Sequence, residues 1–364
     1  MRIGIDAHHL NGKPQGSRTY LLQLIRALNE LIGDGDELRL FSFDPHATRQ
    51  LVDGDHHRIF PKTAKLRLPF VVPILELVHG LDLFHSQYIA PPWSWVPEVV
   101  TIHDVLFETH PELFAGAFSA RSTSLIRRSA KRARVVLTVS EFSRRAILEA
   151  YGIPDERVVV TYNAVDHDRF RVMDTPPTEL LLRFGIDQPF VLCVGRLEPR
   201  KNLERLVGAF GRVRKQLEGG VSLALVGVSD FRYQSILDKM ASLPDGAVKL
   251  LGPVSDDDLA GLYNLAEALA YPSLAEGFGM PVLESMACGT PVLTTRRGAL
   301  PEVGRDAVLY VDPESEDDIA DGLVRILSDT ALRATLQAAG VARARELTWD
   351  ETARRTLDAY RRAL

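Results

Sequence analysis

The expected fold rests on the stretch Glu276-Gly-Phe-Gly-Met-Pro-Val-Leu-Glu284. This stretch continues as Ser-Met-Ala-Cys-Gly289-Thr-Pro-Val-Leu. It predicts a loop that leads into a helix, followed by a short buried strand over residues 290–295. Pro281 suits the first helical turn, because its missing N–H group would have had no partner there. Gly289 suits the left-handed residue that ends a helix. One carboxylate therefore precedes a helix N-terminus, and a second lies in its first turn.

The groups gathered at this helix N-terminus suit a ligand that carries both hydroxyls and phosphates. Gly277 and Gly279 leave backbone N–H groups open to close approach, and free N–H groups at a helix N-terminus bind phosphate. Glu276 and Glu284 can accept hydrogen bonds from hydroxyls. A nucleotide sugar fits this description. Ordinary helix capping is the favoured explanation of the two acids when they are considered alone, so the nucleotide-sugar interpretation depends on the whole string and on a second cluster upstream.

Length and composition indicate an ordinary globular protein with two domains. The 364 residues exceed the size at which one hydrophobic core usually stops growing. The apolar content of 46% and the charged content of 25% are typical of soluble domains, and the net charge of -5 gives no support for nucleic-acid binding. No stretch approaches the roughly 20 apolar residues of a membrane span, and the N-terminal apolar run is too short for a signal peptide. We therefore expect a cytoplasmic protein.

Neither a disulfide nor a metal site is expected. Cys193 and Cys288 both lie in apolar runs and are interpreted as buried core residues in a reducing compartment. The acid pairs Asp34-Gly-Asp36, Asp53-Gly-Asp55 and Asp166-His-Asp168 lie where turns are expected, and we interpret them as turn residues.

The first half of the chain alternates between strands and helices in the order of a doubly wound parallel sheet. Residues 19–32 have the leucine spacing of an amphipathic helix. Gly16 precedes this helix, and His103 follows a strand at its C-terminal end, where ligands bind in open α/β sheets. A turn glycine and a structural histidine are the alternative interpretations. The strands expected in this half are residues 2–5, 38–43, 83–85, 99–102, 135–139 and 158–161.

The second half repeats the alternation after a segment without a strand pattern. Residues 169–187 contain Pro176-Pro177 and are expected to connect the domains. The domains then cover residues 1–168 and 188–346, and an amphipathic helix over 347–364 ends the chain. The strands expected in this half are residues 190–194, 221–226, 248–251, 268–271, 290–295 and 308–311.

Two cations follow the first strand of the second half. Arg196 and Lys201 lie in a strand-to-helix turn, and in a parallel sheet this turn shares the carboxyl edge with residues 276–284. A cation 4 Å from a phosphate charge contributes about 4 kcal/mol at an effective dielectric near 20. The pair could therefore hold a diphosphate beside the helix N-terminus. Solvated surface charges are the alternative.

Two segments of the first half combine features of membrane-facing surfaces. Residues 62–80 mix cations with bulky apolar side chains, which suits a patch that meets a lipid-linked acceptor. A loop and a core helix broken by Pro69 and Pro73 are the alternative, and we favour it somewhat. Residues 121–134 suit an anionic acceptor or the negative cytoplasmic leaflet, although a solvated helix face is equally ordinary. Their six basic residues, without an acidic one, are Arg121, Arg127, Arg128, Lys131, Arg132 and Arg134.

These motifs together resemble the retaining glycosyltransferases of the GT-B architecture, family four, also called group 1. The resemblance covers nearly the whole chain. The opening Met-Arg-Ile-Gly-Ile-Asp-Ala, with Gly16 and Tyr20, is similar to the mannosyltransferase-like branch. The motifs that carry it are Gly195-Arg196, Lys201-Asn202, Leu225-Val-Gly227, Leu251-Gly-Pro-Val254 and, above all, Glu276 to Glu284.

The resemblance implies an α/β protein with two Rossmann-like domains that face each other across a cleft. A nucleoside diphosphate sugar would lie mainly on the C-terminal domain, the N-terminal domain would serve the acceptor, and the last helix would cross back to the N-terminal domain. The implied catalytic residues are His103, Arg196, Lys201 and Glu276. The implied donor-binding residues are Gly16, Gly195, Arg196, Lys201, Gly227, Val254, Glu276, Gly277, Phe278, Gly279, Met280, Pro281 and Glu284.

Each of these residues takes a role from the family. Arg196 and Lys201 would hold the diphosphate. Glu284 would accept hydrogen bonds from the ribose, and the backbone of Val254 would meet the base. Glu276 and the amides of residues 277–280 would position the sugar and a phosphate. Gly16 would close over the phosphate, and His103 would touch the transferred sugar near its reacting face.

The implied reaction is the transfer of a hexosyl group, preferably mannosyl, with retention of anomeric configuration and without a metal or a cofactor. GDP-mannose is the preferred donor and a UDP-sugar the next. The acceptor would be a glycan or a lipid-linked molecule, so the protein could make a peripheral contact with the cytoplasmic face of the inner membrane. Two positions depart from the family pattern: Val228-Ser229-Asp230 follows Gly227 where a second glycine is frequent, and Arg18 replaces another glycine.

Other functions remain open at this point. A sugar-nucleotide epimerase or a phosphorylase could use the same two-domain cleft. A dehydrogenase would need a glycine-rich fingerprint with a following acid, and the first turn offers only Gly12 and Gly16. A binding protein without activity should have lost one of Arg196, Lys201, Glu276 and Glu284, and all four are present.

Overall fold

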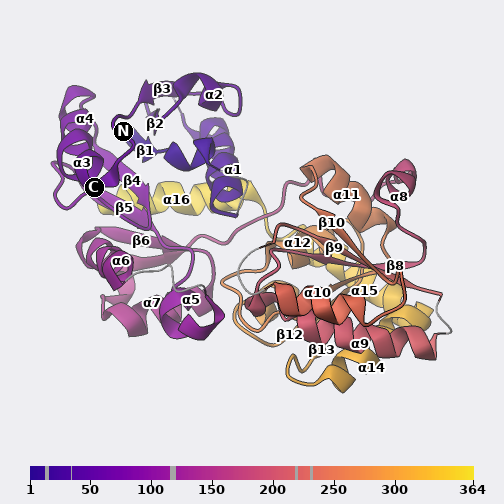
Figure 1. Cartoon of the computed structure of the whole chain (residues 1–364). Helices are drawn as coiled ribbons and strands as arrows, with labels where there is room; N and C mark the ends of the chain where they lie inside the picture. The colour runs from indigo at the N-terminus through magenta and orange to yellow at the C-terminus, as the bar shows by residue number, and fades with distance from the viewer. Residues whose placement is uncertain (13–15, 34, 115–119, 218–219, 230–232) are drawn as a thin grey trace. The chain divides into compact units, whose positions relative to one another are not determined.

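The computed structural model describes residues 1–12, 16–33, 35–114, 120–217, 220–229 and 233–364. Asp34 and Asp230, which belong to motifs named above, lie outside these residues. The chain divides into two compact units. Unit 1 comprises Met1–Thr109, the described part of Gly116–Ala164, and Thr348–Leu364, and unit 2 comprises the described part of His110–Ala115 together with Val165–Leu347. Each unit contains one parallel sheet (Figure 1).

The sheet of unit 1 has seven parallel strands in the order β3-β2-β1-β4-β5-β6-β7. All residues of β4 and β5 are buried, as expected for central strands that are covered on both faces. The strands are β1 (Arg2–Asp6), β2 (Glu37–Ser42), β3 (Asp55–Arg58), β4 (Leu83–Gln87), β5 (Glu98–Thr101), β6 (Val135–Thr138) and β7 (Val158–Val160).

The longer helices of unit 1 are α1 (Gly16–Leu31), α4 (Val72–Val78), α6 (Ala120–Arg132), α7 (Glu141–Tyr151) and α16 (Trp349–Ala363). Shorter ones are η1 (His8–Asn11), α2 (Pro45–Arg49), α3 (Ala64–Leu66), η2 (Arg67–Val71), α5 (Leu106–Thr109) and η4 (Asp155–Arg157). Pro73 lies in the first turn of α4 and so begins this helix, where we had considered that it breaks one.

The last helix of the chain belongs to unit 1. Figure 1 shows α16, in yellow, along the strands of this unit, and α1 packs beside it. Tyr360 of α16 places its hydroxyl 2.7 Å from Nδ1 of the buried His85 in β4. Tyr20 of α1 meets the ring of Trp349 at a centroid distance of 6.1 Å. A buried hydrogen bond and apolar contacts therefore fix the C-terminal segment on the sheet.

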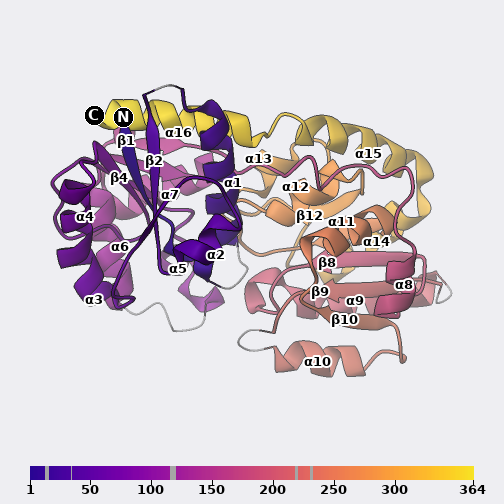
Figure 2. The same cartoon turned by 90° about the horizontal axis from the view of Figure 1, so that it is seen from above.

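The sheet of unit 2 has six parallel strands in the order β10-β9-β8-β11-β12-β13. Figure 2 shows β8, β9 and β10 side by side. The strands are β8 (Phe190–Val194), β9 (Ser222–Val226), β10 (Val248–Gly252), β11 (Ala268–Tyr271), β12 (Val292–Thr295) and β13 (Leu309–Val311).

Helices α9 and α14 pack against each other, and their apolar side chains form one core with the strands of unit 2, including Phe210, Leu225 and Leu323. The helices of unit 2 are η3 (Pro111–Leu113), α8 (Glu179–Phe184), η5 (Pro199–Lys201), α9 (Leu203–Gln216), α10 (Gln234–Ala241), α11 (Asp256–Leu265), α12 (Met280–Ala287), α13 (Leu300–Gly304), α14 (Glu316–Ser328) and α15 (Thr330–Ala344).

The expected α/β class, with two parallel sheets and a final helix on the first unit, is confirmed. The structure draws the boundary at Ala164, where residue 168 was expected. Residues 169–187, expected as a connection, lie within unit 2 and contain α8. The packing explains this placement, because Pro177 and Leu180 lie so close to Gly261 of α11 that a Cβ atom there would come within 2.7 and 2.6 Å of them.

Candidate active site

The strand ends of unit 2 bring Lys201, Tyr271 and Glu276 together. Lys201 ends the short helical turn η5 after β8, Tyr271 is the last residue of β11, and Glu276 lies in the loop that follows. Because β8 and β11 are hydrogen-bonded neighbours in a parallel sheet, their carboxyl ends lie at the same edge. Lys201 and Glu276, two of the predicted residues, therefore meet as expected.

The geometry of this cluster is that of a buried, charge-assisted network. Lys201 Nζ donates to Glu276 Oε1 at 2.6 Å and to the Tyr271 hydroxyl at 2.5 Å. The Tyr271 hydroxyl donates to the same carboxylate oxygen at 2.9 Å. All three side chains are buried. A buried ion pair is retained only when its hydrogen bonds are made, and here they are.

A second cation, Arg200, contacts the other oxygen of the carboxylate. Its Nη1 lies 2.6 Å from Glu276 Oε2, and its Nη2 lies 2.6 Å from Glu198 Oε1. Burial by itself would raise the pKa of Glu276, but Arg200 and then Lys201 outweigh it and lower this pKa to about 2. Glu276 is therefore ionised at neutral pH. For Lys201, burial and the nearby Arg200 lower the pKa, and Glu276 opposes them.

Arg200 was not among the predicted residues, whereas Arg196 was. Arg196 lies in the turn after β8 and is exposed. The turn Pro199–Lys201 directs two consecutive cations to one carboxylate, which the run Glu198-Pro-Arg-Lys201 could have suggested. The sequence could not show which arginine of the turn meets Glu276, because that depends on how the loop after β11 folds back.

Glycines allow the backbone segments to pack closely around the cluster. Gly195 has φ +148°, and a Cβ atom there would lie 3.0 Å from Cε of Lys201. Gly227 has φ +145°, and its Cβ would lie 1.9 Å from the carbonyl oxygen of Gly195. Gly298, which we had not singled out, has φ +60° and would place a Cβ 2.3 Å from the Glu276 carbonyl oxygen. These three glycines therefore allow the strand ends and the Glu276 loop to lie in close contact.

Helix α12 begins beside this loop. Gly279 precedes it with φ 106°, without a side-chain cap, and Pro281 lies in its first turn. The predicted loop-to-helix geometry is therefore present, but Glu284 lies beyond the first turn of α12, where it was expected, because the helix begins only at Met280. Gly277 and the buried Phe278 lie between Glu276 and the helix, and Met280 is its first residue. An N-terminus without a side-chain cap suits an anionic group.

Glu284 has a different environment from Glu276. It lies inside α12, and the hydroxyl of the buried Tyr263 in α11 donates to its Oε2 at 2.9 Å. Burial raises the pKa of Glu284 to about 7, although the hydrogen bond from Tyr263 opposes this shift. Val254 is half-buried in the turn between β10 and α11. Tyr263 was not predicted, because only the fold brings it to Glu284.

In unit 1, His103 follows β5 and is buried. Its Nε2 lies 2.8 Å from Oε1 of Gln87, so the network assigns the ring proton to Nε2. The ring of Tyr20 packs edge-on at a centroid distance of 4.8 Å. Burial lowers the pKa of His103 to about 3, which keeps the ring neutral. Gly16 is the first residue of α1, with open space where a Cβ would be.

A charged cluster in unit 1 was not predicted. Asp6 ends β1 and is buried, and its Oδ1 lies 2.6 Å from Nδ1 of His8. Arg67, also buried, approaches Oδ2 of Asp6 at 3.8 Å. Burial would raise the pKa of Asp6, but His8 and Arg67 lower it to about 2. The His8 ring packs on His9 at a centroid distance of 4.2 Å. An aspartate thus orients a partly exposed imidazole at the carboxyl edge of this sheet.

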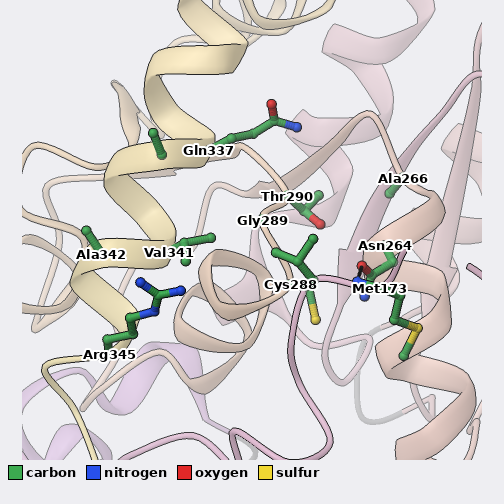
Figure 3. A pocket seen from close by; sticks show the side chains of 12 residues that line it. Met173, Asn264, Ala266, Cys288, Gly289, Thr290, Gln337, Val341, Ala342 and Arg345 are labelled. Carbon is green, nitrogen blue, oxygen red and sulfur yellow. Dashed lines mark hydrogen bonds between the residues drawn. The ribbon is translucent and has the colours of Figure 1, made fainter. Parts of the chain in front are cut away.

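A pocket of about 510 Å³ in unit 2 lies near the C-terminal end of α12, away from the residues predicted to bind the donor. Figure 3 shows Cys288 and Asn264 on one side and Val341 and Arg345 of the α15 segment on the other. Asn264 accepts from the Met173 amide at 2.8 Å and donates to two backbone carbonyls. The polar groups of Asn264 thus anchor the neighbouring chain.

The described residues contain neither a cluster of metal-ligating side chains nor a membrane-spanning helix. Within them, no group of three or more histidine, cysteine, aspartate or glutamate side chains could hold a metal ion. No helix in the described part of the chain has the length and apolar character to cross a bilayer. Both cysteines are buried and unpaired with each other.

The arrangement of two parallel α/β units with a final helix on the first unit is that of GT-B glycosyltransferases. Anabaena Alr3699/HepE, solved in complex with UDP and glucose, matches with a TM-score of 0.77 and 20% identity over 99% of each chain. WaaG, a glycosyltransferase involved in lipopolysaccharide biosynthesis, matches with a TM-score of 0.75 and 16% identity over 98% of this chain and 99% of that chain.

Within this class, the chain belongs to the group 1 glycosyltransferases of family 4. The model of glycosyl transferases group 1 matches residues 182–343, and that of glycosyltransferase family 4 matches residues 14–169. The O-antigen chain mannosyltransferase B of Escherichia coli is 31% identical over 77% of this chain and 74% of its own length. The predicted family, its mannosyltransferase-like branch and the hexosyltransferase class are therefore confirmed.

Two further relatives are informative. The serotype-specific mannosyltransferase WbdA of Escherichia coli is 26% identical over 93% of this chain, which spans only 43% of the length of WbdA. A GDP-mannose-dependent alpha-(1-6)-phosphatidylinositol monomannoside mannosyltransferase of Mycobacterium tuberculosis is 32% identical over 65% of this chain and 63% of its own length.

Proposed function

We propose that the protein transfers a mannosyl group from GDP-mannose to a glycan or lipid-linked acceptor, with retention of configuration and without a metal ion. Mannosyltransferases are among its relatives, and one of them is named as GDP-mannose-dependent. A UDP-sugar is the alternative donor, since a structure similar in fold holds UDP-glucose. The observation that carries the proposal is the pair of cations on Glu276 at the strand ends of unit 2.

The proposed diphosphate site uses cations that the structure already holds in place. Lys201 and Arg200 share the Glu276 carboxylate, so their positions are set before a ligand arrives. Arg196, exposed in the same turn, would add a third positive charge. A diphosphate beside these groups and the N-terminus of α12 would be stabilised by preorganised charge. The Glu276 carboxylate would accept hydrogen bonds from sugar hydroxyls.

The proposed ribose site is Glu284. A carboxylate accepts from two neighbouring hydroxyls only when it is ionised, and Tyr263 fixes one of its oxygens at 2.9 Å. Val254, in the turn that precedes α11, is proposed to meet the base through its backbone. The roles of His103 and Gly16 toward the donor remain predictions.

In the proposed reaction, the bond between the anomeric carbon and the phosphate oxygen breaks while the acceptor oxygen attacks from the same face. The leaving phosphate takes the acceptor proton, so an enzymic base is not required. Positive charge develops on the sugar and negative charge on the diphosphate. Lys201 and Arg200 would stabilise the latter, which is the role that a metal ion has in other phosphate chemistry, and each fixed donor of this kind contributes about 10²–10³ in rate.

A panel of nucleoside diphosphates in a thermal-shift experiment tests the donor assignment. A ligand at about 100 times its dissociation constant adds roughly 2.7 kcal/mol to the stability of the folded state. We expect GDP to give the largest shift. A dominant UDP response would redirect the proposal to UDP-sugars, and the absence of a response to any nucleoside diphosphate would contradict it. Release of GDP from GDP-mannose only when an acceptor is present would separate a transferase from an epimerase.

A further inference from the structure

Unit 1 exposes five large apolar side chains along α3, η2 and α4. We call Leu66, Phe70, Ile74, Leu77 and Val78 the apolar stripe; their exposed fractions lie between 52% and 73%. Phe70, Ile74 and Leu77 follow each other at four and three positions, which places them on one helical face. Val72, on the opposite face, is fully buried in the core. The stripe therefore faces away from the core that the helix helps to form.

Two tryptophans lie beside the apolar stripe. Trp93 and Trp95 are 42% and 61% exposed, and their rings meet edge-on at a centroid distance of 5.5 Å. Glu76 of α4, which is buried, accepts from the Ser94 hydroxyl at 2.7 Å and from the Trp95 amide at 2.8 Å. These bonds fix the tryptophan loop to the flank of α4. Tryptophan side chains concentrate where apolar membrane meets water.

A basic helix lies against the same loop. Ser129 of α6 accepts from the Ala90 amide at 2.9 Å, and Arg132 reaches the carbonyl of Pro91 at 3.3 Å. Both views place α3, α4 and α6 along the same side of unit 1 (Figure 1, Figure 2). Helix α6 contains no acidic residue. Its exposed basic side chains are Arg121, Arg127, Arg128, Lys131 and Arg132, and Lys62 and Lys65 are exposed next to the apolar stripe.

The charge of this surface indicates whether it binds a membrane or a second copy of the chain. A two-fold dimer formed through this face would bring two α6 helices of the same sign together. Acidic side chains nearby are already engaged, because Glu108 pairs with Arg127 at 2.8 Å and Glu98 with Arg132 at 3.7 Å. Positive charge therefore remains on this side of a protein whose net charge is -5. An anionic lipid surface complements both the charge and the apolar groups.

We propose that unit 1 docks on an anionic lipid bilayer through the apolar stripe, Trp93, Trp95 and the basic face of α6. The cations draw the protein to the surface, and the stripe and the tryptophans enter the boundary between headgroups and acyl chains. This inference is independent of the donor and of the reaction proposed above.

Co-sedimentation with vesicles tests the proposal. We expect the wild-type chain to sediment with phosphatidylcholine vesicles that contain about 30% phosphatidylglycerol, and to stay in solution with pure phosphatidylcholine. Binding should fall steeply as salt is raised, since about 1 M salt shortens the screening length to roughly 3 Å. Each basic residue near the surface contributes about fivefold to partitioning. Arg128→Glu with Lys131→Glu should therefore reduce binding at least about 25-fold.

Matched variants distinguish the two contributions. Ile74→Ser with Leu77→Ser should reduce binding at least about tenfold, because two exposed apolar side chains no longer enter the bilayer. Leu182→Ser and Arg325→Glu, at exposed positions of unit 2, should leave it unchanged. Unchanged melting temperatures show that the variants fold. The proposal would be overturned if the protein bound neutral and anionic vesicles equally, or if none of these variants changed the binding. It would also be overturned if the protein were a dimer that only the stripe variant dissociates.

Discussion

Glu276 and Glu284 lie near opposite ends of one short sequence, yet their surroundings move their pKa values in opposite directions. Arg200 and Lys201 overcome burial at Glu276 and lower its pKa to about 2. At Glu284 burial dominates and raises the pKa to about 7. The first acid is therefore a permanent anion that arranges cations. The second changes its charge in the physiological range, which gives the proposed ribose site a pH dependence.

Affinity for a nucleoside diphosphate should rise as the pH rises through about 7. Below this pH Glu284 is protonated and accepts poorly, and above it the carboxylate is ionised and accepts from both ribose hydroxyls. Glu284→Gln should bind the nucleoside diphosphate more weakly and lose the rise in affinity near about pH 7. It should keep the pH dependence that comes from the phosphates themselves. Tyr263→Phe removes a hydrogen bond that lowers the pKa, so it should move the rise in affinity to higher pH.

Calorimetric titration of the wild-type chain and the two variants between about pH 5.5 and about pH 8.5 measures how their nucleoside diphosphate affinities depend on pH. The wild-type and Glu284→Gln curves should converge at low pH and separate at high pH. Parallel curves would show that Glu284 does not meet the ribose.

At the scale of the element, two glycines keep β8 and β9 in contact at their carboxyl ends. Gly227→Ala would drive a Cβ into the Gly195 carbonyl and strain a backbone at φ +145°. We expect it to reduce the free energy of unfolding by roughly 2–5 kcal/mol. Gly185→Ala is a matched control, since Gly185 also has positive φ but has open space around it. It should cost about 1–2 kcal/mol. Equal melting temperatures in differential scanning calorimetry would contradict the close approach.

The helices and strands were largely predictable, because burial on both faces of a parallel sheet gives each central strand a continuous apolar run. Among the strands, the exception is β3 (Asp55–Arg58), which has the sequence Asp-His-His-Arg and lies at the edge of its sheet. Polar residues protect edge strands from pairing with other chains, and they remove the pattern by which a strand is recognised.

The candidate site was only partly predictable. Lys201 and Glu276 follow strands of one sheet, and topology alone brings such residues to one edge. Arg200, Tyr263 and Gly298 were missed, because each acquires its role from a loop or helix far away in the sequence. The Asp6 and Arg67 contact was missed for the same reason, since Arg67 comes from the segment that we had considered for a membrane contact.

At the scale of the whole molecule, the chain returns to unit 1 with its last helix. Tyr360→Phe would leave Nδ1 of the buried His85 without the hydroxyl that now lies 2.7 Å away. An unpaired buried polar group costs about 1–3 kcal/mol. We expect a lower melting temperature for unit 1 and unchanged nucleotide affinity in unit 2. Tyr233→Phe, at an exposed position, is the control. An unchanged melting temperature for Tyr360→Phe would mean that this contact does not anchor the helix.

The central claim is that Lys201 helps to bind a diphosphate. Its direct test is to measure, by isothermal titration, the affinity of Lys201→Met for the nucleoside diphosphate that gives the largest thermal shift. The wild type and Lys215→Met are measured beside it. Lys215 is exposed in unit 2 and is the control for loss of one positive charge. The account predicts that Lys201→Met binds about 10- to 150-fold more weakly, the effect of one lost charge-assisted hydrogen bond, and that Lys215→Met binds like the wild type. Equal affinity of all three proteins would contradict it.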